Sequence, residues 1–297
     1  MRLDAFAATA GVVASRSQAR HLIDAGRITV RGEPRKAGYL VRLGEVVEID
    51  VPPPAPSIAE PEDLALEVLY EDATLIAINK APGMVVHPAP GRWQGTLVNA
   101  LLHRWGRLPS HDQARPGIVH RLDRETSGVM VVARTLTALE HLARQFHDRT
   151  VTKRYVAVVW GVVREDAFVI DAAIGRHPVE RKKMSTRVRG GRTAVTRFRT
   201  LERFGSTSLL EAAPETGRTH QIRVHLSARG HSIVGDRVYG RVRDTAPADI
   251  ARHALHAASL TLRHPVTEET LTLHAPLWPD MRDLIERLRG ARGGILY

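Results

Sequence analysis

The sequence predicts an α+β protein: a mixed, mainly antiparallel β-sheet domain with flanking helices, preceded by a small α/β module. Two observations predict the sheet. The chain holds many short apolar segments with strand-like alternation, and helical periodicity is too rare to connect them all as parallel strands. A third observation predicts the division, because a proline-rich stretch separates two parts of different composition. We expect a module at 1–51, a semi-rigid linker at 52–65 and a main domain at 66–297.

The first part of the chain has the signals of one helix followed by short strands. Ser15 or Ser17 can cap the helix, which runs through Ile23, and Gly26 supplies a C-terminal stop. Two strand-like segments follow at 28–30 and 46–49. A piece of this size buries too little apolar surface to be very stable alone.

The main domain alternates strand-like segments with a few helices. Strands are predicted at 66–70, 75–78, 129–133, 155–163, 194–198, 208–212, 255–262 and 270–274. Helices are predicted to begin at Thr96, Thr135, Thr219 and Asp280. The segment at 155–163 is rich in valine, which is typical of a central strand.

The charge of the chain points to a polyanionic partner. Forty-three Lys and Arg stand against 32 Asp and Glu, which gives a formal net charge of +11. This excess is local. The segment 176–203 holds ten basic residues and two acidic ones, whereas residues 52–70 hold four acidic and no basic residues. The basic segment is therefore a patch and not part of a uniformly basic surface.

Composition and motifs exclude several classes of function. The chain has no cysteine, so disulfides, thiolate catalysis, iron–sulfur clusters and cysteine zinc sites are excluded. It has no P-loop and no Gly-x-Ser-x-Gly nucleophile motif. The fifteen histidines include close pairs, but no carboxylate completes a zinc pattern beside them. We therefore expect no metal and no nucleotide cofactor.

The sequence shows neither a secretion signal nor a membrane-spanning segment. The first residues contain no apolar signal core, and no apolar run approaches the length that spans a membrane. We expect a soluble, cytoplasmic protein without a membrane partner.

The segment 120–128, His-Arg-Leu-Asp-Arg-Glu-Thr-Ser-Gly, contains a candidate catalytic carboxylate. If the chain is extended here, Leu122 points into the core, and Arg121 and Asp123 share the opposite face. Asp123 could then act as a nucleophile or general base in a cleft. An ordinary surface ion pair between the two charged residues is the alternative, and the segment alone does not decide between them.

Arg223 is the candidate partner of this carboxylate. A bidentate guanidinium would keep Asp123 ionised and fix its rotamer. Arg223 lies in the predicted helix that begins at Thr219, within a polar segment that also holds His220.

Two segments of the N-terminal part, 15–20 and 22–32, resemble the alpha-L RNA-binding module. That module occurs in a small-subunit ribosomal protein and in many rRNA-modifying enzymes. The resemblance implies that phosphates are contacted by Arg16, Arg20, Arg27 and Arg31. A solvated basic helix face is the alternative, since the net charge of residues 1–51 is only +2.

The segment 120–128 resembles the signature of the RluA/RluD family of RNA pseudouridine synthases. Other segments match that family in the same order: 79–80 with 83–88, 153–155, 183–185, 194–196, 215–225 and 230–240. One departure is Ala81-Pro82, which stands where many members have the proline first. The resemblance covers nearly all of residues 66–276 and implies a mixed, largely antiparallel sheet with an RNA cleft across it.

The resemblance implies that the protein converts uridine in RNA to pseudouridine. The N1–C1′ bond breaks, the uracil rotates and C5 bonds to C1′, without a cofactor. Asp123 is then the catalytic carboxylate, which attacks C1′, adds to C6 or removes a ribose proton; the sequence does not choose among these. Tyr155 would stack on the uracil and is a candidate for the C5 deprotonation, and Arg223 would orient Asp123.

Further RNA contacts are implied by the same resemblance. Arg121 would fill the gap left by the flipped base or hold a phosphate, and segment 176–203 would form a hairpin that grips RNA. The other residues expected to contact substrate or RNA are His120, Asn79, Lys80, Lys153, Lys183, Arg218 and His220.

The two-part organisation most resembles enzymes of large-subunit rRNA, so rRNA is the expected partner and tRNA the second choice. A non-catalytic RNA-binding factor for ribosome assembly is the alternative from another class, although it would have no evident need for Asp123, Tyr155 and Arg223 together. A hydrolase that uses Asp123 lacks a second carboxylate or base at a recognisable spacing. We expect a monomer.

Overall fold

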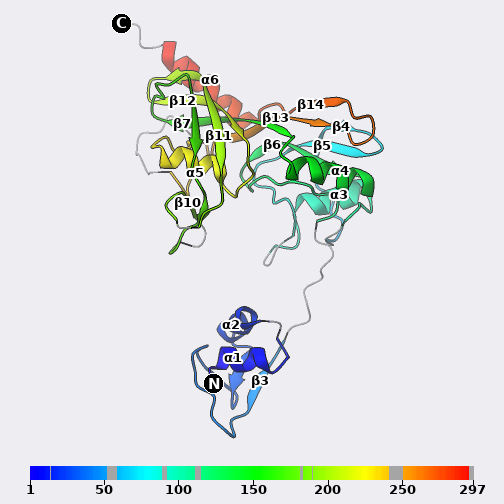
Figure 1. Ribbon diagram of the computed structural model, residues 1–297, viewed down its shortest axis with the longest axis vertical. Helices are drawn as coiled ribbons and strands as arrows, with labels where there is room; N and C mark the ends of the chain where they lie inside the picture. The colour runs from blue at the N-terminus through cyan, green and yellow to red at the C-terminus, as the bar shows by residue number, and fades with distance from the viewer. Residues whose placement is uncertain are drawn as a thin grey trace. The chain divides into compact units, whose positions relative to one another are not determined.

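The protein is described by a computed structural model. The structure describes residues 1–297 except 14, 52–58, 89–91, 111–114, 181–182, 189, 241–249 and 294–297. Contacts within the chain divide it into two compact units, Met1–Ser57 and Ile58–Tyr297 (Figure 1). Each unit has a hydrophobic core of its own.

The smaller unit contains two helices and a three-stranded antiparallel sheet. The helices are α1 (Leu3–Thr9) and α2 (Arg16–Asp24), and the strand order is β2 (Glu33–Pro34), β1 (Ile28–Val30), β3 (Val47–Ile49). Ser15 is the cap of α2, because its side chain accepts from Gln18 N at 3.2 Å. Helix α1 was not predicted; Leu3 and Ala7, one turn apart, bury its inner side.

The larger unit is built on one mixed sheet of nine strands. In order across the sheet these are β4 (Glu67–Glu71), β5 (Leu75–Lys80), β6 (Ser127–Ala133), β13 (Leu255–Arg263), β7 (Thr152–Trp160), β12 (Thr207–Pro214), β11 (Val195–Phe204) and β8 (Ala167–Asp171), with β14 (Thr270–His274) also paired to β13. Only β6 and β13 run parallel among these pairs. The prediction of a mixed, mainly antiparallel sheet is confirmed.

Four helices accompany this sheet in the described part of the chain. They are α3 (Leu97–Trp105), α4 (Leu136–His147), α5 (Gln221–Ala228) and α6 (Pro279–Gly293). Helices α3 and α4 lie beside the β4–β5–β6 half, and α5 and α6 beside the β7–β12–β11 half (Figure 1). The predicted caps are present: Thr96 accepts from Asn99 N, and Thr135 accepts from Ala138 N.

The core of the larger unit has two large apolar clusters, one for each half of the sheet, and a small third cluster of Ile174, Ala194 and Val224. The first cluster gathers around β5, β6, α3 and α4, and the second around β7, β12, α5 and α6. Tyr155 on β7 packs against both. The boundary between the two large clusters therefore lies in the middle of the sheet, at β7.

Part of the expected linker belongs to the larger unit. Ala59 is buried, and the backbone N–H of Gly95 donates to the carboxylate of Glu62 at 3.0 and 3.1 Å. Asn99 in α3 donates from Nδ2 to the carbonyl of Glu60 at 2.7 Å. Residues 52–58 of the expected linker lie outside the described residues.

Several boundaries differ from the sequence prediction. Strand β7 ends at Trp160, three residues before the predicted end, because Gly161 turns the chain with a φ of 86°. Strands β8, β9 (Gly175–Arg176) and β10 (Met184–Ser185) were not predicted. Strands β9 and β10 form a short antiparallel hairpin within the predicted RNA-gripping segment. Residues 181, 182 and 189 of that segment lie outside the described residues.

Candidate active site

The segment that carries Asp123 runs without regular structure and leads into β6. Leu122 is buried in the core, while Arg121 and Asp123 both line a pocket, as the alternation predicted. Strand β6 begins at Ser127, because Gly128 allows it to lie against β13. A Cβ on Gly128 would meet Ala257 O at 2.2 Å, and its φ of 118° is one that L side chains rarely adopt.

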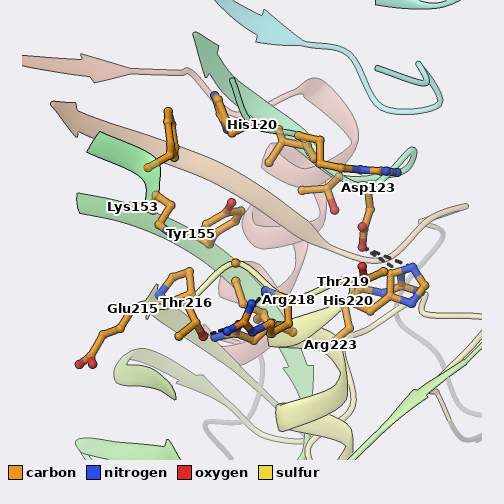
Figure 2. A pocket seen from close by; sticks show the side chains of 18 of the residues that line it. His120, Asp123, Lys153, Tyr155, Glu215, Thr216, Arg218, Thr219, His220 and Arg223 are labelled. Atoms are coloured by element: carbon orange, nitrogen blue, oxygen red, sulfur yellow. Dashed lines mark hydrogen bonds and ion pairs between the residues drawn. The ribbon is translucent and has the colours of Figure 1, made fainter. Parts of the chain in front are cut away.

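The pocket has a volume of about 540 Å³ and draws its walls from both halves of the sheet. The segment before β6, the end of α4 and strand β7 form one side, and the loop at 214–220 with α5 forms the other. Figure 2 shows Tyr155 in the middle of this wall, between Lys153 and Asp123. Its polar lining includes Arg121, Asp123, Arg149, Lys153, Tyr155, Glu215, Arg218, His220 and Arg223.

Arg223 projects from α5 and links two carboxylates. Its Nη1 donates to Asp123 Oδ2 at 3.1 Å, which is the predicted partnership. The predicted bidentate geometry was wrong for this pair. Arg223 instead directs Nε and Nη2 to Asp236, at 2.8 Å to Oδ2 and 3.0 Å to Oδ1. Asp236 thus occupies the Nε/Nη2 edge of the guanidinium, and only Nη1 donates to Asp123.

Asp236 is a site residue that the sequence analysis missed. Its side chain is fully buried, and Oδ1 also accepts from the backbone N–H groups of Val238 and Tyr239, at 2.9 and 3.0 Å. Burial by itself would raise the pKa of Asp236, but Arg223 and the two N–H groups hold that pKa below its usual value. Burial likewise opposes the charge of Arg223, and the hydrogen-bonded Asp236 outweighs it, so the pKa of Arg223 is raised.

The two oxygens of Asp123 have different surroundings. Oδ2 faces Arg223 at 3.1 Å and His220 Nε2 at 3.8 Å. Oδ1 has no hydrogen-bond partner among the residues that the structure describes. The side chain is 22 % exposed, at the wall of the pocket. One oxygen is therefore held and the other remains available to a molecule in the pocket.

His220 caps α5 in a left-handed conformation, with a φ of 58°. Its Nδ1 lies 2.8 Å from the hydroxyl of Tyr239, and the two rings meet edge to face. Burial lowers the pKa of His220, against the smaller opposite effect of Asp123. A neutral imidazole is therefore favoured beside the ion pair of Asp123 and Arg223.

Tyr155 lies on β7 and reaches the pocket from the floor of the sheet. Burial raises the pKa of Tyr155, and the negative charge of Asp123 raises it further. Its hydroxyl has no hydrogen-bond partner within the described ranges. The side chain is thus an uncharged aromatic face with a free phenol group at the pocket wall.

Basic side chains gather at the rim. Lys153 lies on the same face of β7 as Tyr155 and is half-buried, and burial lowers its pKa, with Arg149 acting in the same direction. No described residue forms a hydrogen bond or ion pair with the Lys153 ammonium. Arg121 is exposed, and Arg218 donates from Nε to Thr193 O at 3.1 Å. These side chains give the rim of the pocket a positive charge.

Two of the predicted RNA contacts are wrong because the residues lie on a strand buried on both faces. Asn79 donates to Glu67 Oε2 and Pro276 O, both at 3.1 Å, and its side chain is buried. Lys80 is 0 % exposed, and its ammonium donates to the carbonyls of Ala81, Met84 and Arg124. Burial lowers the pKa of Lys80 to about 7. Lys80 therefore ties the loop after β5 to the turn that follows Asp123.

His120 lines the pocket. Its Nε2 accepts from Val131 N at 3.0 Å, and the ring stacks on Phe146 with centroids 4.5 Å apart. Burial lowers the pKa of His120 to about 3, so the ring is neutral. The predicted contact of His120 with RNA stays a prediction, and it would not use Nε2, because that nitrogen accepts from the backbone N–H of Val131.

Lys183 lies on the β9–β10 hairpin and outside the pocket lining. Its ammonium pairs with Glu180 Oε2 at 2.7 Å, and the side chain is half-exposed. The predicted RNA contact of Lys183 stays a prediction, and it would lie on the hairpin rather than in the pocket.

In the smaller unit, two predicted phosphate contacts also have an internal partner. Arg16 and Arg20 pair with the buried carboxylate of Asp4, at 3.2 and 3.0 Å, and Arg2 pairs with it at 3.1 Å. The pKa of Asp4 is lowered to about 2, and the hydrogen bond from Arg2 contributes most to this shift. Arg16 and Arg20 remain 56 % exposed. Asp4 thus holds them in place while their outer surfaces face solvent.

The other arginines of the smaller unit lie on its surface. Arg27 pairs with Asp50 at 2.6 Å, and Arg31 is exposed in a turn with a φ of 54°. No group of three or more potential metal ligands occurs in the part of the chain that the structure describes. Within the same residues, no helix has the length and apolar character needed to cross a membrane.

A family model described as RNA pseudouridylate synthase matches residues 74–228, and an S4 domain model matches residues 1–47. A relative named uncharacterized RNA pseudouridine synthase YlyB, from Bacillus subtilis, is 44 % identical over 97 % of this chain and 94 % of its own length. Ribosomal large subunit pseudouridine synthase D of Neisseria meningitidis is 43 % identical over 97 % of this chain and 79 % of its own.

Solved structures show the same fold. Human RNA pseudouridylate synthase domain containing 1 aligns with a TM-score of 0.60 and 30 % identity, over 76 % of this chain and 95 % of that one. The match of the family model to more than half of the chain and the identities of the relatives confirm the resemblance found in the sequence. The chain therefore belongs to the RNA pseudouridylate synthase family and is an RNA pseudouridine synthase with an S4 domain.

Proposed function

We propose that this enzyme converts uridines of large-subunit rRNA to pseudouridine and that Asp123 is its catalytic carboxylate. The observation that carries the role of Asp123 is the asymmetry of its carboxylate: Arg223 holds Oδ2, and Oδ1 is left without a partner at the pocket wall. The choice of rRNA is supported by relatives that are named ribosomal large subunit pseudouridine synthase D, at 43 % and 47 % identity.

The pocket suits one nucleotide that has left its stack. A volume of about 540 Å³ is within the ordinary range for small-molecule sites, and its apolar floor includes Tyr155. Because the Tyr155 ring is uncharged and packs against both halves of the core, it offers a rigid face for a uracil. Enzymes that act on a base read it after it has flipped out, by stacking and by contacts to its edge.

The reaction fits a site with one reactive carboxylate. The uracil N1–C1′ bond breaks, a C5–C1′ bond forms, the proton of C5 leaves and N1 gains a proton, so nothing else is consumed. Asp123 Oδ1 is the oxygen available for attack on C1′, for addition to C6 or for removal of a ribose proton. Arg223 favours the ionised carboxylate and fixes its rotamer through Oδ2.

RNA contacts beyond the flipped nucleotide are assigned to three surfaces. Lys153, Arg121 and Arg218 at the pocket rim are placed for phosphates next to the target. The β9–β10 hairpin with Lys183 would hold a neighbouring strand. Residues 1–51, as a separate RNA-binding module, would bind a further part of the rRNA.

We also propose that the enzyme acts as a monomer in the cytoplasm. The monomer is supported by the pocket, which already brings Asp123, Tyr155 and Arg223 around the same space without a residue from a second copy. The cytoplasm follows from the proposed substrate.

The variant Asp123→Asn tests the catalytic role. The amide keeps the size of the side chain but is a poor nucleophile and base, so tritium release from RNA labelled at C5 of uridine should stop while RNA binding persists. Asp63→Asn is the control, because Asp63 is highly exposed and remote from the pocket lining. Tritium release by Asp123→Asn at the rate of the control would refute the role of Asp123.

The substrate is tested by mapping pseudouridines in cells with and without the gene. We expect large-subunit rRNA to lose specific sites that the wild-type gene restores and Asp123→Asn does not. Loss confined to tRNA would overturn the proposed substrate. If cells without the gene have a defect in ribosome assembly, Asp123→Asn should not correct it. Correction of that defect without return of the pseudouridines would show that the protein acts in assembly rather than by modification.

A further inference from the structure

Tyr239 lies behind the pocket, where it contacts both the site and the hairpin. Its hydroxyl is 2.8 Å from His220 Nδ1 and 2.8 Å from the backbone nitrogen of Met184 on β10. Its ring lies 5.0 Å from the guanidinium carbon of Arg223. Tyr239 does not line the pocket itself. It therefore reaches the catalytic groups only through other side chains.

The polarity of these hydrogen bonds can be deduced. A backbone N–H can only donate, so Met184 donates to the Tyr239 oxygen. The hydroxyl proton of Tyr239 then has one acceptor among the described residues, His220 Nδ1. If Nδ1 carried a proton, the Tyr239 oxygen would accept twice and its own proton would have no acceptor among the residues that the structure describes. The arrangement is therefore satisfied when Nδ1 is bare.

A neutral imidazole with a bare Nδ1 carries its proton on Nε2. Nε2 is the nitrogen that faces Asp123 Oδ2, at 3.8 Å. This distance is longer than a hydrogen bond, so the N–H points toward the held oxygen without replacing Arg223. Both donors thus lie on the side of Oδ2, and Oδ1 stays free for the uridine.

The backbone adds a reason for such a support. His220 holds a φ of 58°, which is uncommon for a residue with a side chain, and its side chain caps no N–H of α5. Some tertiary contact must keep the ring in place. Among the described residues, the Tyr239 hydroxyl is the only hydrogen-bond partner of the His220 ring, and Asp123 lies farther away at 3.8 Å.

We propose that Tyr239 is a positioning residue that fixes His220 as an Nε2–H donor facing Asp123 Oδ2 and ties this geometry to the β9–β10 hairpin through Met184. The proposal rests on the proposed role of Asp123. A shift of the hairpin against Tyr239 would change the support of His220, so the site is best formed when β10 sits as it does in this structure.

The variant Tyr239→Phe tests this assignment because it removes the hydroxyl and keeps the ring beside Arg223. With the hydroxyl proton gone, His220 should populate both neutral tautomers, and kcat for tritium release should fall about fivefold to tenfold while the Kd for RNA stays within twofold. Tyr70→Phe is the matched control. Its hydroxyl donates to Asp72 at 2.7 Å in the same unit, away from the pocket lining.

The tautomer is read directly from nitrogen-15 chemical shifts of the imidazoles, with His220→Gln used to assign the His220 signals. In the wild-type enzyme we expect Nδ1 to be bare and Nε2 to be protonated. The opposite tautomer would overturn the proposal, even if Tyr239→Phe failed to fold. This measurement does not depend on turnover, so it tests the role of Tyr239 separately from the proposed function. If the wild-type enzyme released no tritium from any rRNA, the proposed function would be refuted and the tautomer of His220 would still be measurable.

A double mutant shows whether Tyr239 acts through His220. If it does, Tyr239→Phe added to His220→Gln should lower kcat by less than twofold, because the group that Tyr239 positions is already gone. Full additivity of the two losses in kcat would contradict the proposal, and so would an equal loss of kcat in Tyr70→Phe and Tyr239→Phe.

Discussion

Arg223 and Asp236 form a charge pair that is buried beneath the pocket, and Asp123 is attached to it by a single hydrogen bond. Removing one member of a buried pair leaves the other charge without compensation, which commonly costs about 3 to 5 kcal/mol. The pair therefore supports Asp123: Asp236 fixes the position of the guanidinium, and the guanidinium fixes one oxygen of Asp123.

The variant Asp236→Asn should lower the free energy of unfolding by about 3 kcal/mol and reduce kcat, because Arg223 loses its bidentate partner. The sign of the pH effect follows from the lowered pKa of Asp236. Its contribution to stability is present above the unfolded-state value of 3.8 and is lost as the pH falls through the folded-state pKa. Urea unfolding across pH should therefore show a shallower acid loss in the variant below about pH 4. An unchanged acid slope would contradict this account.

Tyr155 allows the ring and the hydroxyl to be tested separately. In Tyr155→Phe the ring is kept and only an unpaired hydroxyl is removed, so we expect the Kd for RNA and the midpoint of unfolding to stay near wild type. Tyr155→Ala loses the stacking face, which should weaken RNA binding by about tenfold, since base–aromatic stacking is worth roughly 1 to 3 kcal/mol. Equal binding by the two variants would show that the ring does not stack on the base.

At the scale of elements, the parallel pair of β6 and β13 brings the Asp123 segment next to the middle of the sheet. The register joins Ser127 to His256 and Gly128 to Ala257. Two side-chain contacts fasten the same junction: Ser127 Oγ lies 2.9 Å from His256 Nδ1, and Thr126 Oγ1 lies 2.8 Å from His253 Nε2. Burial lowers the pKa of His253 to about 3 and that of His256 to about 4, so both contacts involve neutral rings.

Gly128→Ala should disrupt this junction. The new Cβ would clash with the backbone of Ala257, so we expect a loss of about 4 kcal/mol or more in the free energy of unfolding, or failure to fold. Gly290→Ala in α6 is the control, because nothing lies within 4 Å of its added Cβ and alanine favours a helix. Urea unfolding measures both variants, and equal midpoints would refute the steric argument.

At the scale of the whole molecule, the chain consists of two units with separate cores. The core of the smaller unit includes Leu3, Leu22 and Ile28. The core of the larger unit includes the two clusters that Tyr155 contacts. A core that is complete within its own unit does not need the other unit in order to fold. RNA affinity, by contrast, would be shared between the two when both bind one RNA.

Deletion of residues 1–51 should therefore leave the thermal unfolding of the larger unit unchanged within a few degrees while RNA binding weakens. The slope of log K against log salt should also become shallower, because fewer phosphates are neutralised. Fluorescence binding titrations at several salt concentrations measure the slope. The same affinity and slope in the deletion variant would contradict an RNA-binding role for the smaller unit.

Local patterns in the sequence predicted much of the site. Alternation in 120–128 predicted that Leu122 lies in the core and that Arg121 and Asp123 face a cleft. Leu122 is buried in the first apolar cluster as predicted, and all three residues contribute to the pocket lining. The pairing of Arg223 with Asp123 was also predicted, although the residues are 100 positions apart, because a carboxylate in a basic chain needs a cation to hold it. The α+β class followed from the periods of the strands and helices, which depend on neighbouring residues alone.

Tertiary structure decided what each polar side chain is used for. Asn79 and Lys80 were expected at the RNA, but β5 lies in the middle of the core, so their polar atoms satisfy backbone carbonyls and neighbouring side chains. The bidentate partner of Arg223 could not be predicted either. Asp236 reaches it only because α5 and the following loop pack together over the sheet.

The sequence by itself determined the class of fold, the division into two parts and the catalytic candidates, since these depend on short-range periodicity, composition and motif order. Only the tertiary structure decided which oxygen of Asp123 is free, which carboxylate holds Arg223 and which side chain supports His220. Those facts depend on distances between segments that are remote in the chain, and such distances are set by the packing of the two halves of the sheet.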